Sequence, residues 1–127
     1  MDMENKVRQI RELVEAKREK FARVSDEVWA VPELYFHETK SAAILIKALK
    51  EEGFEVQEGV DGIPTAFIGT WGSGKPVIGI LGEFDALPSL SQEAGCWEHK
   101  EIVKGGPGHG CGHNALGAGA MAAAVAA

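Results

Sequence analysis

Gly108-His109-Gly110-Cys111-Gly112-His113-Asn114 is the stretch that decides how this chain is interpreted, because it leads from a long loop into an alanine-rich helix. It places one thiol and two imidazoles within five positions, on a backbone that contains three glycines. Cys111 and His113 stand two residues apart, so both can reach one ion where the chain is extended or turning. Thiolate sulfur and imidazole nitrogen are ligands that zinc, or another late first-row metal, prefers. A catalytic metal usually takes three or more protein ligands, so this pair predicts further ligands elsewhere.

The first part of the chain predicts a helix. Apolar residues recur there at three- and four-residue steps with charged residues between them, the spacing of one helical face. Pro32 ends this helix, because the residue before a proline is pushed out of the helical region. The apolar positions are Val7, Ile10, Leu13, Val14, Phe21, Val24 and Val28.

The middle of the chain predicts a second helix, three strands and a long loop. The second helix ends at Gly53, a residue suited to a helix C-terminus. Residues 54–58 alternate apolar and polar, as an edge strand does, whereas 66–71 and 77–81 are apolar runs typical of buried strands. Residues 89–110 form a loop of a length that is usually functional or mobile. This order predicts an α/β fold with a mixed or parallel sheet flanked by helices.

Two acidic residues follow the last predicted strand. Glu83 and Asp85 are two positions apart, so on a strand both would point to the same face. In open α/β sheets the carboxyl ends of strands are where ligands bind. We therefore interpret the two acids as functional, with solvated loop-edge charges as the alternative. His109 is open to three interpretations: a third metal ligand, a proton shuttle or a solvated loop residue.

The composition excludes several classes of partner. Thirteen Lys and Arg against 19 Asp and Glu give a net charge of −6 without a basic stripe, which argues against nucleic acid or an anionic membrane as partner. Residues 115–127 are apolar but too few to span a bilayer. No signal-peptide pattern follows the first residue, and only Cys96 and Cys111 are present, so we expect a reducing cytoplasm. The apolar last helix predicts an N-terminal piece of a longer protein.

Several motifs together resemble one family. Asp85-Ala-Leu-Pro88, then a long loop, then the 108–114 stretch, resemble the M20 peptidase and amidohydrolase superfamily, in particular its aminoacylase-like branch. Residues 31–34 and 51–56 also resemble the start of that branch. The resemblance covers nearly all of this chain but only the opening part of the family's catalytic chain. It implies that residues 1–127 are the N-terminal portion of a zinc-peptidase-like catalytic domain, incomplete without later residues.

The resemblance also implies an activity. It is the metal-dependent cleavage of the amide bond of an N-acyl amino acid, with p-aminobenzoyl-glutamate as a candidate, by a homo- or hetero-oligomeric enzyme. Two divalent ions per subunit, zinc or manganese, are implied. Cys111 and His113 would be ligands, Asp85 would stand beside them, and Glu83 and His109 would lie close by. The remaining ligands, the catalytic glutamates and a dimerisation domain would lie past residue 127.

Two other functions remain open. In the first, Cys111 is the nucleophile of a hydrolase and is activated by His109 or His113. A chelator would abolish activity in the metal hypothesis, whereas a thiol-selective alkylator alone would do so in this one. In the second, the chain is a truncated, non-catalytic subunit that only binds a partner.

Overall fold

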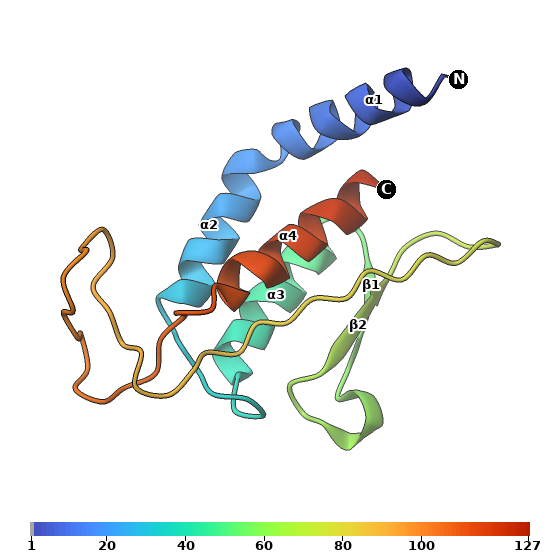
Figure 1. The fold of residues 1–127 in the computed structure, drawn as a ribbon. Coiled ribbons are helices and arrows are strands. Elements are labelled where there is room, and N and C mark those ends of the chain that lie inside the picture. Colours follow the sequence, from blue (N-terminus) through green and yellow to red (C-terminus); the bar gives the residue numbers. More distant parts are fainter. Residues whose placement is uncertain (1) are drawn as a thin grey trace.

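The computed structural model describes residues 2–127 and contains four α-helices and a two-stranded sheet. Figure 1 shows α2, α3 and α4 side by side, with the hairpin of β1 and β2 beyond α3 and long connections that leave and re-enter this body. The α/β class expected from the sequence is confirmed. The elements in chain order are α1 (Met3–Ala16), α2 (Arg18–Trp29), α3 (Thr39–Glu51), β1 (Glu55–Glu58), the 3-10 turn η1 (Val60–Gly62), β2 (Phe67–Thr70) and α4 (His113–Ala126).

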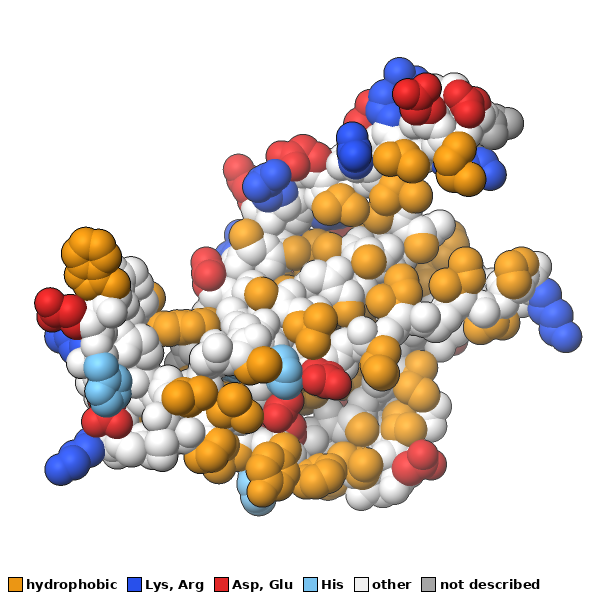
Figure 2. Space-filling view, in the orientation of Figure 1, with side chains coloured by type: hydrophobic (Ala, Val, Ile, Leu, Met, Phe, Trp, Pro, Cys, Tyr) orange, Lys and Arg blue, Asp and Glu red, His pale blue; other side chains and the backbone are white. Residues whose placement is uncertain are grey.

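The expected first helix is in fact two helices. The backbone breaks at Lys17, where φ is −105° and ψ is 1°. The apolar positions after the break are buried, whereas none of the residues of α1 is buried. Only α2 packs against both α3 and α4, whereas α1 projects from the body (Figure 1). Figure 2 shows hydrophobic side chains on the side of α1 that faces the body and charged ones on the other side.

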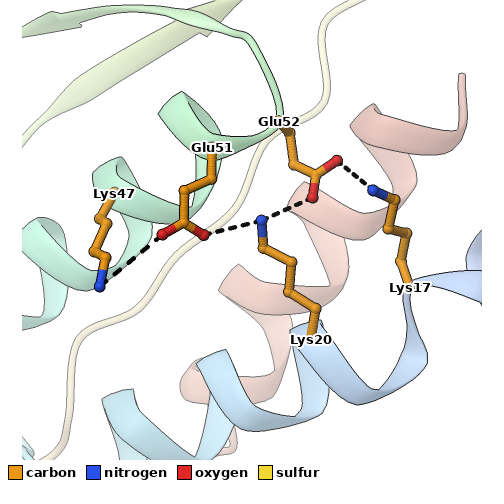
Figure 3. Close-up of polar contacts among 5 residues, drawn as sticks. All are labelled: Lys17, Lys20, Lys47, Glu51 and Glu52. Atoms are coloured by element: carbon orange, nitrogen blue, oxygen red, sulfur yellow. Dashed lines mark hydrogen bonds and ion pairs between the residues drawn. The ribbon is translucent and has the colours of Figure 1, made fainter.

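A network of lysines and glutamates fixes the junction between α1 and α2 to the end of α3 (Figure 3). The Nζ atoms of Lys17 and Lys20 each lie 2.7 Å from a different carboxylate oxygen of Glu52. Lys20 also reaches Glu51 at 3.1 Å, and Lys47 lies 3.9 Å from the same carboxylate. The side chain of Glu52 is only 10 % exposed. Hydrogen bonds from Lys17 and Lys20 lower the pKa of Glu52, so this carboxylate stays charged.

The hydrophobic core lies between α2, α3 and α4. The helix α4 approaches residues 82–84 closely because small residues meet there. A Cβ atom added to Gly117 would lie 3.0 Å from the carbonyl oxygen of Glu83, and one added to Gly82 would lie 2.9 Å from the Cβ atom of Ala120. The buried residues that form the core are Phe21, Val24, Val28, Leu45, Ala48, Leu49, Ala118 and Met121.

The two strands expected at 54–58 and 66–71 pair as an antiparallel hairpin. Glu55 is opposite Thr70 and Glu58 is opposite Phe67. The hairpin packs on α3 through Gly69, where an added Cβ would lie 2.8 Å from a methyl carbon of Leu49. These strands are half-exposed, in contrast to the buried strand expected for the second of them.

The prediction of a buried strand at residues 77–81 is wrong for this part of the chain. Val77 is 84 % and Leu81 87 % exposed, and no strand is assigned there. The apolar run has the composition of a strand, but among residues 2–127 no other segment pairs with it. None of the described helices is long and apolar enough to cross a membrane.

Two isolated bridges join the connections to the body. Leu34 pairs with Ala86 in a parallel bridge, and Leu87 pairs with Gly108 in an antiparallel one. Parallel and antiparallel pairing therefore both occur, as a mixed arrangement requires. The second bridge closes the base of the long loop, so the residues before the loop and those after it lie side by side.

Candidate functional site

The site forms where the segment that carries the two acids meets the first turn of α4. Gly112 adopts a left-handed conformation, with φ at 81°, and turns the chain into α4 directly before His113. A side chain would strain this position, so the glycine is required by the turn. The next residue, Asn114, is buried and donates hydrogen bonds to the side-chain and main-chain oxygens of Ser25 at 2.9 and 3.3 Å. The first turn of α4 is therefore fixed against α2.

His113 lies between the two acidic residues. Its Nδ1 atom is 2.8 Å from Oδ1 of Asp85, and its Nε2 atom is 3.4 Å from Oε2 of Glu83. An ionised carboxylate can only accept hydrogen bonds, so Nδ1 carries the proton and donates it to Asp85. The Nε2 atom then presents its lone pair toward Glu83. The sequence expectation that Asp85 and Glu83 converge on one centre is in accord with this geometry.

The donor atoms of these residues fit a metal ion. One ligand atom from each of Glu83, Asp85 and His113 lies within 4.8 Å of the others. Two ligands at about 2.0 Å from a tetrahedral zinc lie about 3.3 Å apart. The 3.4 Å between Nε2 of His113 and Oε2 of Glu83 matches this spacing, and it is long for a hydrogen bond. The side chain of Glu83 is 58 % exposed, so solvent and ligands reach the site from that side.

Cys111 does not join this cluster in the structure. Its side chain is exposed, and the thiol is not among the three grouped ligands found in residues 2–127. The left-handed turn at Gly112 separates it from His113. Both cysteines are free, and Cys96 is half-buried in the loop. The pair Cys111 and His113, adjacent in sequence, is thus less close to a common centre than His113 and Glu83.

His109 is buried, and its interpretation as a solvated loop residue is wrong. The residue is 9 % exposed, and neither ring nitrogen has a hydrogen-bond partner in the described part of the chain. Burial lowers the pKa of His109, and His113 adds to this, while the Val28 backbone and Asp85 act in the opposite direction. The imidazole is therefore neutral at pH 7 and lies beside the cluster.

Sequence reasoning missed two supports of the site. Asn114 stands at the end of the glycine-rich stretch, and its contact with Ser25 spans 89 positions, so no local spacing could predict it. Glu33 binds the first turn of α3 through its carboxylate. A glutamate several residues ahead of a helix is an unusual place for a cap, and the usual N-cap patterns do not include it.

The α/β body and the histidine held between two carboxylates are those of a metal-dependent hydrolase of the M20 type. No family model matches the chain. Over 124 residues it is 48 % identical to a component protein of the p-aminobenzoyl-glutamate hydrolase of Escherichia coli K12, a match covering 98 % of this chain and 26 % of that protein. It is 38 % identical over 85 residues to thermostable carboxypeptidase 2 of Saccharolobus solfataricus, covering 65 % of this chain and 21 % of that protein. It is 27 % identical over 128 residues to the mouse (Mus musculus) Xaa-Arg dipeptidase, covering 93 % of this chain and 26 % of that protein.

These relatives are all hydrolases by name, and the resemblance seen in the motifs is confirmed. The chain belongs to the M20 peptidase and amidohydrolase superfamily. It spans about a quarter of the length of the curated relatives it matches.

Proposed function

We propose that the protein containing this chain is a metal-dependent amidohydrolase that cleaves the amide bond of an N-acyl amino acid. Residues 1–127 would form the N-terminal portion of its catalytic domain. The observation that carries the proposal is the position of His113, with Asp85 on one ring nitrogen and Glu83 facing the other. The hydrolase names of the relatives support the same class of reaction.

His113 and Glu83 would hold a divalent ion, zinc or manganese, with Cys111 as a further ligand after a change in the turn at Gly112. Later residues of the protein would complete the coordination, which we propose to include two ions per subunit. When bound, such ions supply a Lewis acid for the amide carbonyl and lower the pKa of water. Imidazole and carboxylate suit either metal, whereas a thiolate favours zinc.

Asp85 would orient His113. Its carboxylate accepts the Nδ1 proton, which fixes the tautomer, prevents rotation of the ring and makes Nε2 a better donor of its lone pair. His109 would stay neutral beside the pair, because burial opposes its charged form. A neutral imidazole there adds no positive charge that would compete with a cation.

The substrate and the assembly are proposed from the relatives. The Escherichia coli protein is named for p-aminobenzoyl-glutamate and as one subunit of its enzyme, so we propose this aromatic N-acyl glutamate as substrate and a hetero-oligomer as the working form. The net charge of −6 disfavours a nucleic-acid partner. Two free cysteines favour the cytoplasm as location.

The test uses the complete protein. Release of glutamate from p-aminobenzoyl-glutamate is measured before and after dialysis against a chelator, and again after zinc or manganese is restored. We expect activity to vanish and return. His113→Ala should lower the bound metal measured by elemental analysis, whereas His37→Ala, an exposed histidine ahead of α3, should not. Full activity in chelator-treated protein shown to be free of metal would refute the proposal.

A thiol hydrolase is the second candidate, because Cys111 is exposed and free near His113. Cys111→Ser separates the two functions in the complete protein. A ligand role predicts loss of at least one metal ion per subunit, since a hydroxyl is a far less acidic donor than a thiol. A nucleophile role predicts full metal and lost activity. Cys96→Ser is the control and should change neither.

A further inference from the structure

We propose that Glu33 is a positioning residue that keeps Asp85 in register with His113 by joining Asp85 to the start of α3. The inference deepens the proposed function and rests on it only for its kinetic effect. Its structural part concerns the contact between Nδ1 of His113 and Oδ1 of Asp85, which can be observed without hydrolysis.

The carboxylate of Glu33 receives most of the free donors at the first turn of α3. Its Oε2 atom accepts from the backbone N–H of Lys40 at 3.0 Å, and from the N–H and hydroxyl of Ser41 at 2.9 and 3.0 Å. Its Oε1 atom lies 3.3 Å from the hydroxyl of Thr39. Glu38, the residue at the N-cap position, makes no capping hydrogen bond with its side chain. Glu33 therefore caps α3 from outside the helix, where a negative charge is favoured.

The main chain of the same residue holds the segment that carries Asp85. The carbonyl oxygen of Glu33 accepts the N–H of Ala86 at 2.8 Å, and Leu34 forms the parallel bridge with Ala86. Ala86 is fully buried and directly follows Asp85. The side chain of Glu33 thus grips α3 while its backbone grips the neighbour of Asp85. Movement of residue 33 would move the acceptor of the His113 proton.

The charge of Glu33 matters to this grip. Two backbone N–H groups and two hydroxyls converge on its oxygens. None of the ion pairs in residues 2–127 includes Glu33, so the hydrogen bonds to α3 are what hold the carboxylate in place. A glutamine there would turn an NH₂ group toward N–H donors and lose part of the cap. Alanine would lose all of it.

Glu38 offers a matched control. It is a glutamate at the same end of α3 and is 8 % exposed, and it accepts a hydrogen bond from the hydroxyl of Thr65 at 2.9 Å. It has no hydrogen bond to the segment that carries Asp85. Replacing Glu38 therefore perturbs the same helix end without touching the link to Ala86.

The experiment follows the Nδ1–H resonance of His113 in the complete protein labelled with ¹⁵N-histidine, assigned through its loss in His113→Ala. We expect Glu33→Ala to shift or broaden this resonance and Glu33→Gln to do so less. The kcat for p-aminobenzoyl-glutamate should fall by about 10-fold, the lower end for residues that support a metal ligand, while KM stays within about twofold. Glu38→Ala should leave the resonance and kcat unchanged even if it lowers the free energy of unfolding.

Each outcome is decisive. An unchanged resonance in folded Glu33→Ala would overturn the inference, and so would an equal shift in Glu38→Ala, because general loosening of α3 would then be the cause. If Glu33→Ala does not fold, the resonance in Glu33→Gln decides in the same way. A shifted resonance in a protein that hydrolyses no N-acyl amino acid would support the positioning role and refute the proposed function.

Discussion

Replacing Gly108 with alanine would place a methyl group inside the backbone of the opposite segment. The new Cβ atom would lie 1.8 Å from the carbonyl oxygen of Leu90 and 2.4 Å from its carbonyl carbon. An ordinary contact needs about 1.5 Å more. Both partners are main chain, so no side chain can rotate away and one segment has to move.

The cost follows from what that movement breaks. Leu87 and Gly108 exchange two N–H···O hydrogen bonds of 3.0 Å, each worth about 1 kcal/mol. Overpacking adds about 1–3 kcal/mol, and alanine recovers about 0.4–1 kcal/mol by restricting the unfolded chain. We therefore expect Gly108→Ala to lower the free energy of unfolding by about 3 kcal/mol, a large part of the stability of a typical domain.

The assay is urea unfolding of the complete protein together with its bound metal, since His113 follows five residues after the substituted glycine. Gly119→Ala is the control. It lies in α4 with no atom within 4 Å of an added Cβ, so the change should be neutral or raise stability by up to about 1 kcal/mol. A free energy of unfolding for Gly108→Ala within about 0.5 kcal/mol of the parent would refute the close approach of the two segments.

Three further predictions concern other contacts. Asp85→Asn keeps the size of the side chain but loses the charge that stabilises the donor imidazole, so activity or metal affinity should fall about 10–100-fold; a value equal to the parent would make Asp85 a structural turn residue. Gly117→Val should lower the free energy of unfolding by about 1–3 kcal/mol, because an added Cβ already lies 3.0 Å from the carbonyl oxygen of Glu83; an unchanged urea midpoint would contradict this. Glu52 has a lowered pKa, so its stabilisation is present at neutral pH and disappears as the pH falls through that value. Glu52→Gln should therefore cost about 1 kcal/mol at pH 7, less than a fully buried pair because Lys17 is 40 % exposed, and the difference should vanish near pH 3 in urea titrations; a difference that persists there would assign the effect to packing.

The local elements of the fold could be predicted because local chemistry determines them. The helix that ends before Gly53 has its apolar face and its left-handed glycine, with φ at 85°, as the spacing indicated. The alternation at 54–58 also corresponds to a strand. The break at Lys17 could not be predicted, since the three- and four-residue spacing continues through it without interruption. Only the tertiary packing distinguishes the buried half of that pattern from the exposed half.

The candidate site was predictable in its residue types and not in its contacts. Glu83, Asp85 and His113 were all proposed from motifs, and the structure brings them together. The hydrogen bond between Asp85 and His113 spans 28 positions, which no local period encodes. The burial of His109 could not be read from the sequence, because imidazole is equally compatible with solvent and with a protein interior. The run at 77–81 failed for a similar reason, since strand pairing depends on a partner and not on composition alone.

The bridge between Leu87 and Gly108 makes the site independent of the length of the loop that separates its two halves. The loop begins and ends at one pair of hydrogen-bonded residues, so the chain between them is closed whatever its length. Doubling such a loop costs only about 0.6 kcal/mol of closure entropy. Extra residues inserted beside Trp97, which is 99 % exposed, would leave Asp85 and His113 in place. This loop is therefore the part of the chain in which insertions, deletions or a fluorescent tag are best tolerated.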